Sequence, residues 1–247
     1  MGDATAMILA AGRGERMRPL SDATPKPLLV AGGKALVVHQ IEALARAGHR
    51  DIAINASHLA DRLVDALADG RALGVRLHWS IEPEPLETAG GLATASPLFA
   101  PVPIVVVSGD IWTDYDYAAL APRIAAIAGP ADPARAHLVM VPNPPYHPQG
   151  DFRLPASADG RPGRLALPDA PSPAPSVAPV LTYGNIGVYH PALFAELPRG
   201  VKLKLLPLYR EWIGAGIVTG ERYDGRWANI GTPEDLAGLD AALAGRA

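Results

Sequence analysis

Residues 6–20 read AMILAAGRGERMRPL and join an apolar run to a loop rich in glycine and arginine. The uncharged run is typical of a buried strand, and Gly12 and Gly14 predict a tight loop directly after it. Glycine lets backbone amides approach a ligand closely, and amides at a helix N-terminus attract anions. The segment therefore predicts a strand that leads into a polyphosphate-binding loop. Taken alone, it is equally compatible with a glycine turn before a solvated basic helix.

The chain beyond this loop alternates between helical and extended patterns. Apolar residues recur at helical spacing in 37–44 and 59–67. Strand-like segments occur at 52–54, 75–81, 104–107 and 137–141. This alternation predicts βαβ units, with ligands at the carboxyl ends of parallel strands. We therefore predict an α/β fold, with a Rossmann-like, mixed and mostly parallel sheet flanked by helices.

Beyond about residue 145 prolines are frequent, and this half reads as an elaborated lid with a strand at 183–189 and a helix at 204–213. Near the C-terminus, Thr232 precedes Pro233 and two acidic residues. This pattern predicts an N-capped final helix. The proline-rich segment 168–179 is interpreted as a passive surface insertion, with a lid over a ligand as the alternative.

Composition narrows the classes of function. The 247 residues include 22 Lys and Arg against 25 Asp and Glu, a formal net charge of −3. This balance creates no field that would hold nucleic acid or an anionic membrane, so neither is expected as a partner. The lack of cysteine excludes disulfides, thiolate nucleophiles and zinc–cysteine sites. The N-terminal apolar run is too short for a signal peptide or a membrane span, so we expect a cytoplasmic protein.

Two charged residues stand out by their positions. Lys26 is fixed between Pro25 and Pro27, which favours a functional lysine over a solvated one. Asp110 comes directly after the apolar strand 104–107, and a carboxylate there suits Mg²⁺ that is carried by substrate phosphates. Capping of the next segment is the alternative for Asp110.

Three further features carry weaker signals. We interpret Asp114 and Asp116 as capping or solvated loop acids. The side-chain oxygen of Asn229, in a short strand before the last helix, could be a second metal ligand. The turn 86–91, LETAGG, could admit a flat base against the backbone, but a plain helix start is favoured.

Together these segments resemble the sugar-1-phosphate nucleotidyltransferases. The hallmark of that family is L-A-A-G-x-G-x-R-x-x-P-L followed closely by P-K-P, and residues 9–20 and 25–27 match it closely. The family also has a T-A-G-G or T-A-G-A turn, a G-D after a central strand, and W-x-D/N-x-G-T-P near the C-terminus. All of these occur between Leu9 and Pro233 in the family's order. The resemblance therefore covers nearly the whole chain and implies the nucleotide-diphospho-sugar transferase fold.

Within the family, residues 85–91, 110–116 and 150–152 look most like the uridylyltransferases that act on N-acetylmuramate 1-phosphate in bacterial cell-wall recycling. The resemblance implies Mg²⁺-dependent transfer from UTP to N-acetylmuramic acid 1-phosphate, giving UDP-N-acetylmuramic acid and pyrophosphate without a protein nucleophile. It also implies one domain, 1–247, with a nucleotide-binding half at about 1–145 and a sugar-binding half at about 146–247. UTP and the sugar 1-phosphate would be the partners, and the compact length favours a monomer.

The resemblance also implies roles for individual residues. Arg16 would hold the β- and γ-phosphates, Lys26 would neutralise charge around the α-phosphate, and Asp110 would complete the catalytic set. Asp110 and Asn229 would ligate Mg²⁺. The nucleotide would contact Gly12, Arg13, Gly14, Glu15, Arg16, Lys26, Thr88, Gly90, Gly91 and Ser108. The sugar phosphate would contact Asp151, Asn185 and Lys204.

Departures from the family pattern leave alternatives. Many members have Asp where Asn229 stands, and near relatives have Asn where Ser108 stands. A muramate carboxylate calls for a facing cation, for which the candidates are Lys202, Lys204 and Arg153. Guanylyl or thymidylyl transfer to mannose- or glucose-1-phosphate is the enzyme alternative, and a non-catalytic nucleotide-sugar sensor is the other. A dinucleotide-dependent oxidoreductase is disfavoured because Met17 occupies the third glycine position of that fingerprint.

Overall fold

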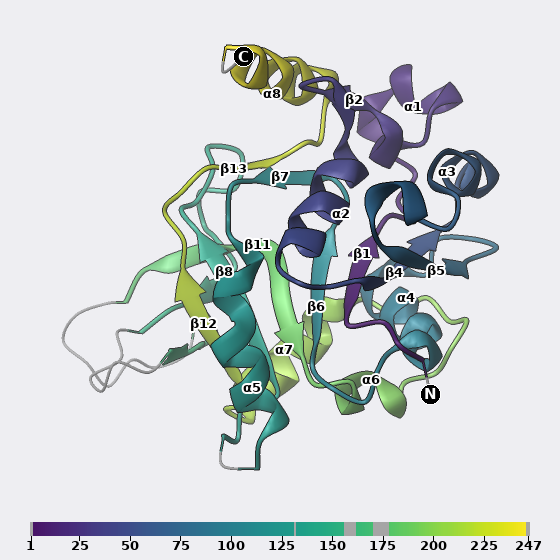
Figure 1. Cartoon of the computed structure of the whole chain (residues 1–247). Helices are drawn as coiled ribbons and strands as arrows, with labels where there is room; N and C mark the ends of the chain where they lie inside the picture. The colour runs from purple at the N-terminus through teal and green to yellow at the C-terminus, as the bar shows by residue number, and fades with distance from the viewer. Residues whose placement is uncertain (1, 131, 156–161, 170–177, 246–247) are drawn as a thin grey trace.

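The computed structural model describes residues 2–130, 132–155, 162–169 and 178–245. In these ranges the main sheet has the strand order β10-β12-β8-β11-β6-β1-β4-β5, and β9 pairs with β11 (Figure 1). The strand bounds are β1 (Ala6–Leu9), β4 (Asp51–Ala56), β5 (Arg76–Ile81), β6 (Ile104–Ser108), β8 (Ala136–Val141), β9 (Phe152–Arg153), β10 (Gly163–Arg164), β11 (Val180–Tyr189) and β12 (Val218–Arg222). Strands from both halves of the chain therefore share one sheet.

The sheet is mixed, as the sequence predicts. β1 pairs in parallel with β4 and β6, β4 with β5, and β8 with β12. β11 runs antiparallel between β6 and β8, and its register shifts between Tyr183 and Gly187. This bulge changes the direction in which the side chains between Tyr183 and Gly187 point, and Asn185 within it has a φ of 57°. The shift places an irregular stretch of backbone in the middle of the sheet.

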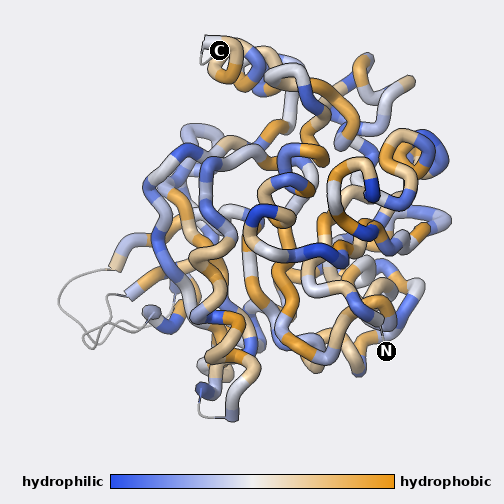
Figure 2. The backbone as a smooth tube through the Cα atoms, in the orientation of Figure 1, coloured by the Kyte–Doolittle hydropathy of each residue, from blue (hydrophilic) through white to orange (hydrophobic). Residues whose placement is uncertain are grey.

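Helices cover both faces because the central strands are apolar on both sides. The fully buried Ile8 belongs to an apolar cluster that includes residues of α2 (Leu36–Arg46), α3 (Ala60–Leu67) and α5 (Ala121–Ala128). Its neighbour Met7 belongs to a second cluster, which includes residues of α4 (Glu87–Ala95), α6 (Ala192–Ala195) and α7 (Leu205–Gly214). Figure 2 shows hydrophobic residues following the central strands. Side chains alternate across a strand, so a continuously apolar strand must be covered twice.

A small apolar cluster at one end of the sheet includes Met17, Trp112, Ile230 and Leu239. It joins α8 (Pro233–Ala244) to the β2 (Val30–Ala31)–β3 (Lys34–Ala35) hairpin and to the β7 (Ile111–Thr113)–β13 (Trp227–Asn229) pair (Figure 1). The remaining short elements are α1 (Leu20–Ala23), η1 (Glu15–Met17), η2 (Lys26–Leu28), η3 (Arg71–Leu73), η4 (Ser96–Leu98) and η5 (Tyr117–Leu120). The β7–β13 pairing brings the C-terminal motif beside Asp110, since Ile230 N donates to the Asp110 carbonyl at 2.8 Å.

The predicted helix start at Thr232 is confirmed. Thr232 Oγ1 accepts from Asp235 N at 3.2 Å, and Asp235 Oδ2 accepts from Thr232 N at 2.9 Å, a reciprocal capping box. Residues 170–177 of the proline-rich segment lie outside the described residues, so the interpretation of that segment stays a prediction. Within the described ranges, none of the helices combines the length and apolar character that crossing a membrane requires.

Candidate active site

A cavity of about 680 Å³ lies beyond the carboxyl ends of β1 and β6. We call it the phosphate cavity, because four cations face it: Arg13, Arg16, Lys26 and Lys202. The other lining residues are Gly12, Gly14, Glu15, Pro85, Glu87, Asp110 and Gly231. All three predicted catalytic residues, Arg16, Lys26 and Asp110, therefore line one cavity, together with the predicted loop 12–15.

Lys26 and Asp110 form the central ion pair. Lys26 Nζ donates to Asp110 Oδ2 at 2.7 Å, and the lysine is only 8% exposed. Pro25 precedes the short helix η2 and Pro27 lies within it, so the two prolines on either side of Lys26 fix where the lysine side chain begins. Among the described residues, Asp110 Oδ1 has no hydrogen-bond partner, and the ammonium keeps a positive charge at the cavity wall.

The loop after β1 needs glycine at position 14. Gly14 has a φ of 65°, and a Cβ there would lie 3.1 Å from Lys26 Cβ. Ser21 Oγ donates to the Gly14 carbonyl at 2.8 Å, which holds the turn closed. At the far side of the cavity, a Cβ on Gly231 would lie 3.3 Å from both Nη atoms of Arg16, so the absence of a side chain at Gly231 makes room for the guanidinium.

A second cavity of about 340 Å³ adjoins the first, and we call it the base cavity. It is lined by Leu9, Ala11, Gly12, Asn55, Glu82, Pro85, Leu86, Glu87, Thr88, Ser108 and Asp110, none of which is a cation. Ser108 and Thr88 are thus placed where the sequence predicts nucleotide contacts. Gly90 and Gly91 are instead buried inside α4: Gly90 N donates to the Leu203 carbonyl at 3.1 Å, and a Cβ there would meet the Val201 carbonyl oxygen.

A buried polar chain that the sequence analysis missed connects the two glycine-containing segments. Ala10 N donates to Asn55 Oδ1 at 2.8 Å, Asn55 Nδ2 donates to Glu82 Oε1 at 2.6 Å, and Leu86 N donates to Glu82 Oε2 at 3.0 Å. Burial raises the pKa of the Glu82 carboxyl, although its bonds to Asn55 and Leu86 act in the opposite direction. The chain ties the loop after β1 to the start of α4. Its signal in the sequence is the polar residue at the end of each parallel strand.

We expect Glu82→Gln to destabilise the fold by about 1–3 kcal/mol, the cost of a buried polar group without a partner. Both Glu82 oxygens accept hydrogen bonds, so the amide nitrogen of Gln would face another donor, either Asn55 Nδ2 or Leu86 N. Rotating the Asn55 amide would present an acceptor to the new nitrogen, but Asn55 would then lose the hydrogen bond that it accepts from Ala10 N. Urea unfolding measures the loss, with Glu84→Gln as the control because the Glu84 side chain is 59% exposed. Equal losses for the two variants would contradict the prediction.

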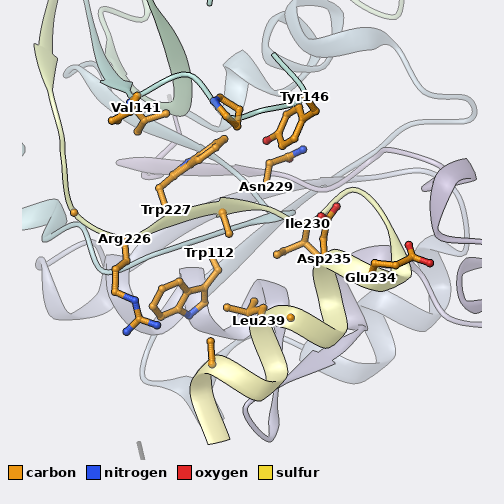
Figure 3. A pocket seen from close by; sticks show the side chains of 16 residues that line it. Trp112, Val141, Tyr146, Arg226, Trp227, Asn229, Ile230, Glu234, Asp235 and Leu239 are labelled. Atoms are coloured by element: carbon orange, nitrogen blue, oxygen red, sulfur yellow. The ribbon is translucent and has the colours of Figure 1, made fainter. Parts of the chain in front are cut away.

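Asn229 and Tyr146 lie together at a third cavity, of about 650 Å³ (Figure 3). Their side chains share a hydrogen bond, and the Tyr146 hydroxyl also interacts electrostatically with Asp110 and Arg16. Burial raises the pKa of Tyr146. No motif pointed to Tyr146, because a lone tyrosine in a proline-rich loop carries no spacing signal. The same cavity is walled by Trp112 and Trp227, and Arg226 lies 5.1 Å above the Trp112 ring.

The oxygens of Asp110 and Asn229 fit a Mg²⁺ ion that arrives with substrate phosphates. β13 and β7 place Asn229 opposite Ile111, the residue after Asp110. Across the described ranges no group of three or more His, Cys, Asp or Glu residues could hold a metal. Two protein oxygens with phosphate and water ligands are the arrangement that Mg²⁺ prefers, whereas a cage made only of protein ligands is not offered here.

The predicted sugar-phosphate residues are spread around the second half of the sheet. Asp151 Oδ2 accepts from Tyr183 N at 2.8 Å, and its Oδ1 lies 3.1 Å from His147 Nε2, so both oxygens have protein partners. Asn185 lies in the bulge of β11, and Lys204 is exposed directly before α7. None of the three lines the cavities described above. Their contact with a sugar phosphate stays a prediction.

The loop acids behave as predicted. Asp116 Oδ1 accepts from Ala118 N at 3.0 Å and caps η5, while Asp114 Oδ1 accepts from Arg226 N at 2.8 Å and from the Tyr223 hydroxyl. Of the three cations considered for a sugar carboxylate, Lys202 is the one that lines the phosphate cavity, where its ammonium lies 2.6 Å from Glu84 Oε2 and lowers the Glu84 pKa. Arg153 instead donates to the Ala178 and Pro168 carbonyls.

Comparisons with known proteins point in one direction. Residues 5–144 match the family model described as Nucleotidyl transferase. The chain is 42% identical to the N-acetylmuramate alpha-1-phosphate uridylyltransferase of Neisseria meningitidis serogroup B, over 92% of this chain and 93% of that one. It is 33% identical to the Caulobacter vibrioides protein of the same name, over 97% of this chain and 96% of that one.

A solved structure shows the same fold at lower sequence similarity. It comes from Bacillus anthracis and is described as a candidate glucose-1-phosphate thymidylyltransferase. The TM-score is 0.77 and the identity 19%, over 97% of this chain and 94% of the other. At this level of identity the likeness concerns the arrangement of the sheet and helices.

Proposed function

Since the chain belongs to the nucleotidyl transferase family, we propose that it transfers the uridylyl group of UTP to N-acetylmuramate 1-phosphate. An oxygen of the sugar phosphate attacks the α-phosphorus of UTP, and the bond from that phosphorus to the bridging oxygen of the β-phosphate breaks. The products are UDP-N-acetylmuramic acid and pyrophosphate, which retains the electron pair of the broken bond. The proposal includes a role for this reaction in bacterial cell-wall recycling, which stays a prediction.

The observation that carries the proposal is the junction of the two cavities. A cationic cavity beside a cavity without cations is what a nucleoside triphosphate requires, with its phosphates in one and its base in the other. Asp110 lines both cavities and is bound to Lys26 at 2.7 Å. The α-phosphate of a bound nucleotide would lie at this junction. The Lys26–Asp110 ion pair is held in place there, unlike an ion pair on the solvated surface.

The residues act by positioning and by neutralising charge. Lys26 presents an ammonium to the α-phosphate, where negative charge grows as the new bond forms. Arg16 offers a planar guanidinium with several donors to the β- and γ-phosphates, which leave as pyrophosphate. The turn at Gly14 lets the loop 12–15 approach the phosphates closely. No protein nucleophile is needed, because the sugar phosphate itself attacks.

Asp110 and Asn229 would hold Mg²⁺ through a carboxylate and an amide oxygen. When bound, the ion orients the phosphates and stabilises the charge that develops on them. The Tyr146 hydroxyl interacts with the Asn229 side chain, and accepting from its amide nitrogen would leave the amide oxygen for a ligand. This orientation matters more for Asn than for the Asp of many relatives, since a carboxylate presents an oxygen on either side.

The substrate choice rests on the relatives' names and on the cations at the site. N-acetylmuramate carries a carboxylate that glucose and mannose lack. Lys202 lines the phosphate cavity and pairs with Glu84 there, and we propose that it also faces this carboxylate. The proposal also includes a cytoplasmic location, a monomer and a single domain spanning 1–247, which stay predictions.

The test is pyrophosphate release from four nucleoside triphosphates combined with N-acetylmuramate-, N-acetylglucosamine-, glucose- and mannose-1-phosphates. We expect turnover to be strongest for UTP with the muramate substrate and to be abolished by a chelator of divalent cations. Preference for GTP with mannose 1-phosphate, or for dTTP with glucose 1-phosphate, would retain the reaction and overturn the substrates. Nucleotide binding without release for any pair would favour a sensor.

A further inference from the structure

Glu87 stands out in the nucleotide site because of its backbone and its charge. Its φ is 62°, in the left-handed region that favours glycine, and its side chain is exposed. It is the first residue of α4, where an acidic side chain stabilises a helix. That role does not require the left-handed position, because an acidic residue elsewhere in the first turn would also stabilise the helix. An unfavourable backbone conformation at a site is a reason to ask what the side chain does there.

The cavities place Glu87 beside one particular part of a nucleotide. The residues that line both the phosphate and base cavities are Gly12, Pro85, Glu87 and Asp110. Asp110 is already bound to Lys26, and Gly12 and Pro85 have no polar side chain. Within the described residues, the Glu87 carboxylate has no hydrogen bond or ion pair with a side chain. A nucleotide that spans both cavities puts its ribose between its base and its phosphates, and therefore beside Glu87.

Charge decides which ligand groups the carboxylate can accept. It repels phosphate oxygens, so it is not a phosphate ligand, and it has no donor for a base carbonyl. It could accept from the N3–H of uracil, but Glu87 lines the junction of the two cavities, where the ribose lies, as well as the base cavity. The ribose carries two neighbouring hydroxyls, each a donor, and a carboxylate has two oxygens to accept them. Hydrogen bonds to an ionised acceptor are stronger than neutral ones. A substrate analogue that lacks one hydroxyl loses such a bond.

We propose that Glu87 accepts hydrogen bonds from the ribose hydroxyls of the nucleotide and makes the enzyme select ribonucleotides over deoxyribonucleotides. This rests on the proposed nucleotidyl transfer and adds the recognition of the sugar of the nucleotide. It assigns the 2′- and 3′-hydroxyls as the groups that Glu87 recognises, and it gives a reason for a glutamate at a position where glycine would fit the backbone without strain.

The experiment compares UTP with dUTP and with 3′-deoxy-UTP, by kcat/KM and by Kd from calorimetry. The native enzyme should prefer UTP over each analogue, and the preference over dUTP should be on the order of 10- to 100-fold, as expected for a charge-assisted bond at an exposed position. Glu87→Gly should reduce the preference over dUTP to within about 3-fold of unity. Glu87→Gly also removes the side chain from the left-handed position, so its melting temperature should not fall. This separates loss of selectivity from loss of folding.

Glu84→Gln is the matched control. Glu84 is three positions away, pairs with Lys202 and lines neither cavity, so its removal should leave the UTP to dUTP ratio unchanged. An unchanged ratio in Glu87→Gly would overturn the proposal, as would a change in the UTP to GTP ratio alone, which would make Glu87 a reader of the base. Absence of turnover with every sugar phosphate would count against the proposed function, while the Kd ratio would still test Glu87.

Discussion

Asp110→Asn should lower kcat/KM for nucleotidyl transfer by about 10³-fold, or ~4 kcal/mol of transition-state stabilisation. Asp110 lines both cavities and holds the Lys26 ammonium at 2.7 Å, so its charge governs the junction where the α-phosphorus reacts. Asparagine keeps the size and an acceptor for Lys26, but it removes the negative charge on which Mg²⁺ binding depends. Initial rates of pyrophosphate release over a range of Mg²⁺ concentrations measure both effects.

Stability must be followed in the same variant. The side chain of Asp110 is 35% exposed and that of Lys26 is 10% exposed, so neutralising the aspartate leaves a largely buried ammonium without its counter-charge. We expect this to cost on the order of 1–2 kcal/mol, which urea unfolding would detect without unfolding the protein at the assay temperature.

Asp116→Asn is the control, because Asp116 caps η5 and does not line the phosphate cavity. Each substitution removes one negative charge, so the overall charge changes by the same amount in both variants. If the two variants lost activity to the same extent, the loss would reflect net charge or folding, and the assignment of Asp110 would be wrong.

Local patterns predicted the parts of the fold that they govern. The apolar run at β1, the periodicity of α2 and α3, and the cap at Thr232 depend on neighbours within a few residues, so the sequence contains their signals. The antiparallel direction of β11 has no such signal. A strand that is buried on both faces has the same apolar pattern whether it runs parallel or antiparallel to its neighbours. The bulge at Asn185 likewise depends on the pairing of β11 with β8.

The same distinction applies to the site. Lys26 and Asp110 each stand in a motif that marked them as candidates, and the structure shows that they form an ion pair, which the motifs did not predict. The chain from Ala10 through Asn55 to Glu82 joins three strands, so its geometry could not be read from spacing, although Asn55 and Glu82 occupy the strand-end positions that identified Asp110. Tyr146 reaches Asn229 through a loop whose path the sequence does not specify. The sequence analysis therefore missed the site residues whose contacts join segments that are far apart along the chain.

Arg16→Ala should reduce kcat/KM for UTP by about 10²- to 10³-fold, mainly through kcat. The guanidinium lies at the wall of the phosphate cavity beside Gly231, and charge on the pyrophosphate increases as the bond to the α-phosphorus breaks. An interaction that strengthens as the leaving group departs affects kcat more than substrate binding. In the reverse reaction the same variant should bind pyrophosphate weakly.

Matched variants separate the guanidinium from its charge. Arg16→Lys should recover only part of the activity, because lysine lacks the planar set of donors that bind two phosphate oxygens together. Gly231→Ala should give an intermediate loss, since the new Cβ would lie 3.3 Å from both Nη atoms and displace the guanidinium slightly. Arg18→Ala is the control: Arg18 Nε pairs with Asp22 Oδ1 at 3.1 Å, and the residue does not line the cavity. If Arg16→Ala lost no more activity than Arg18→Ala, the assignment of Arg16 would be wrong. Lys26 or Lys202 would then have to stabilise the charge on the departing pyrophosphate.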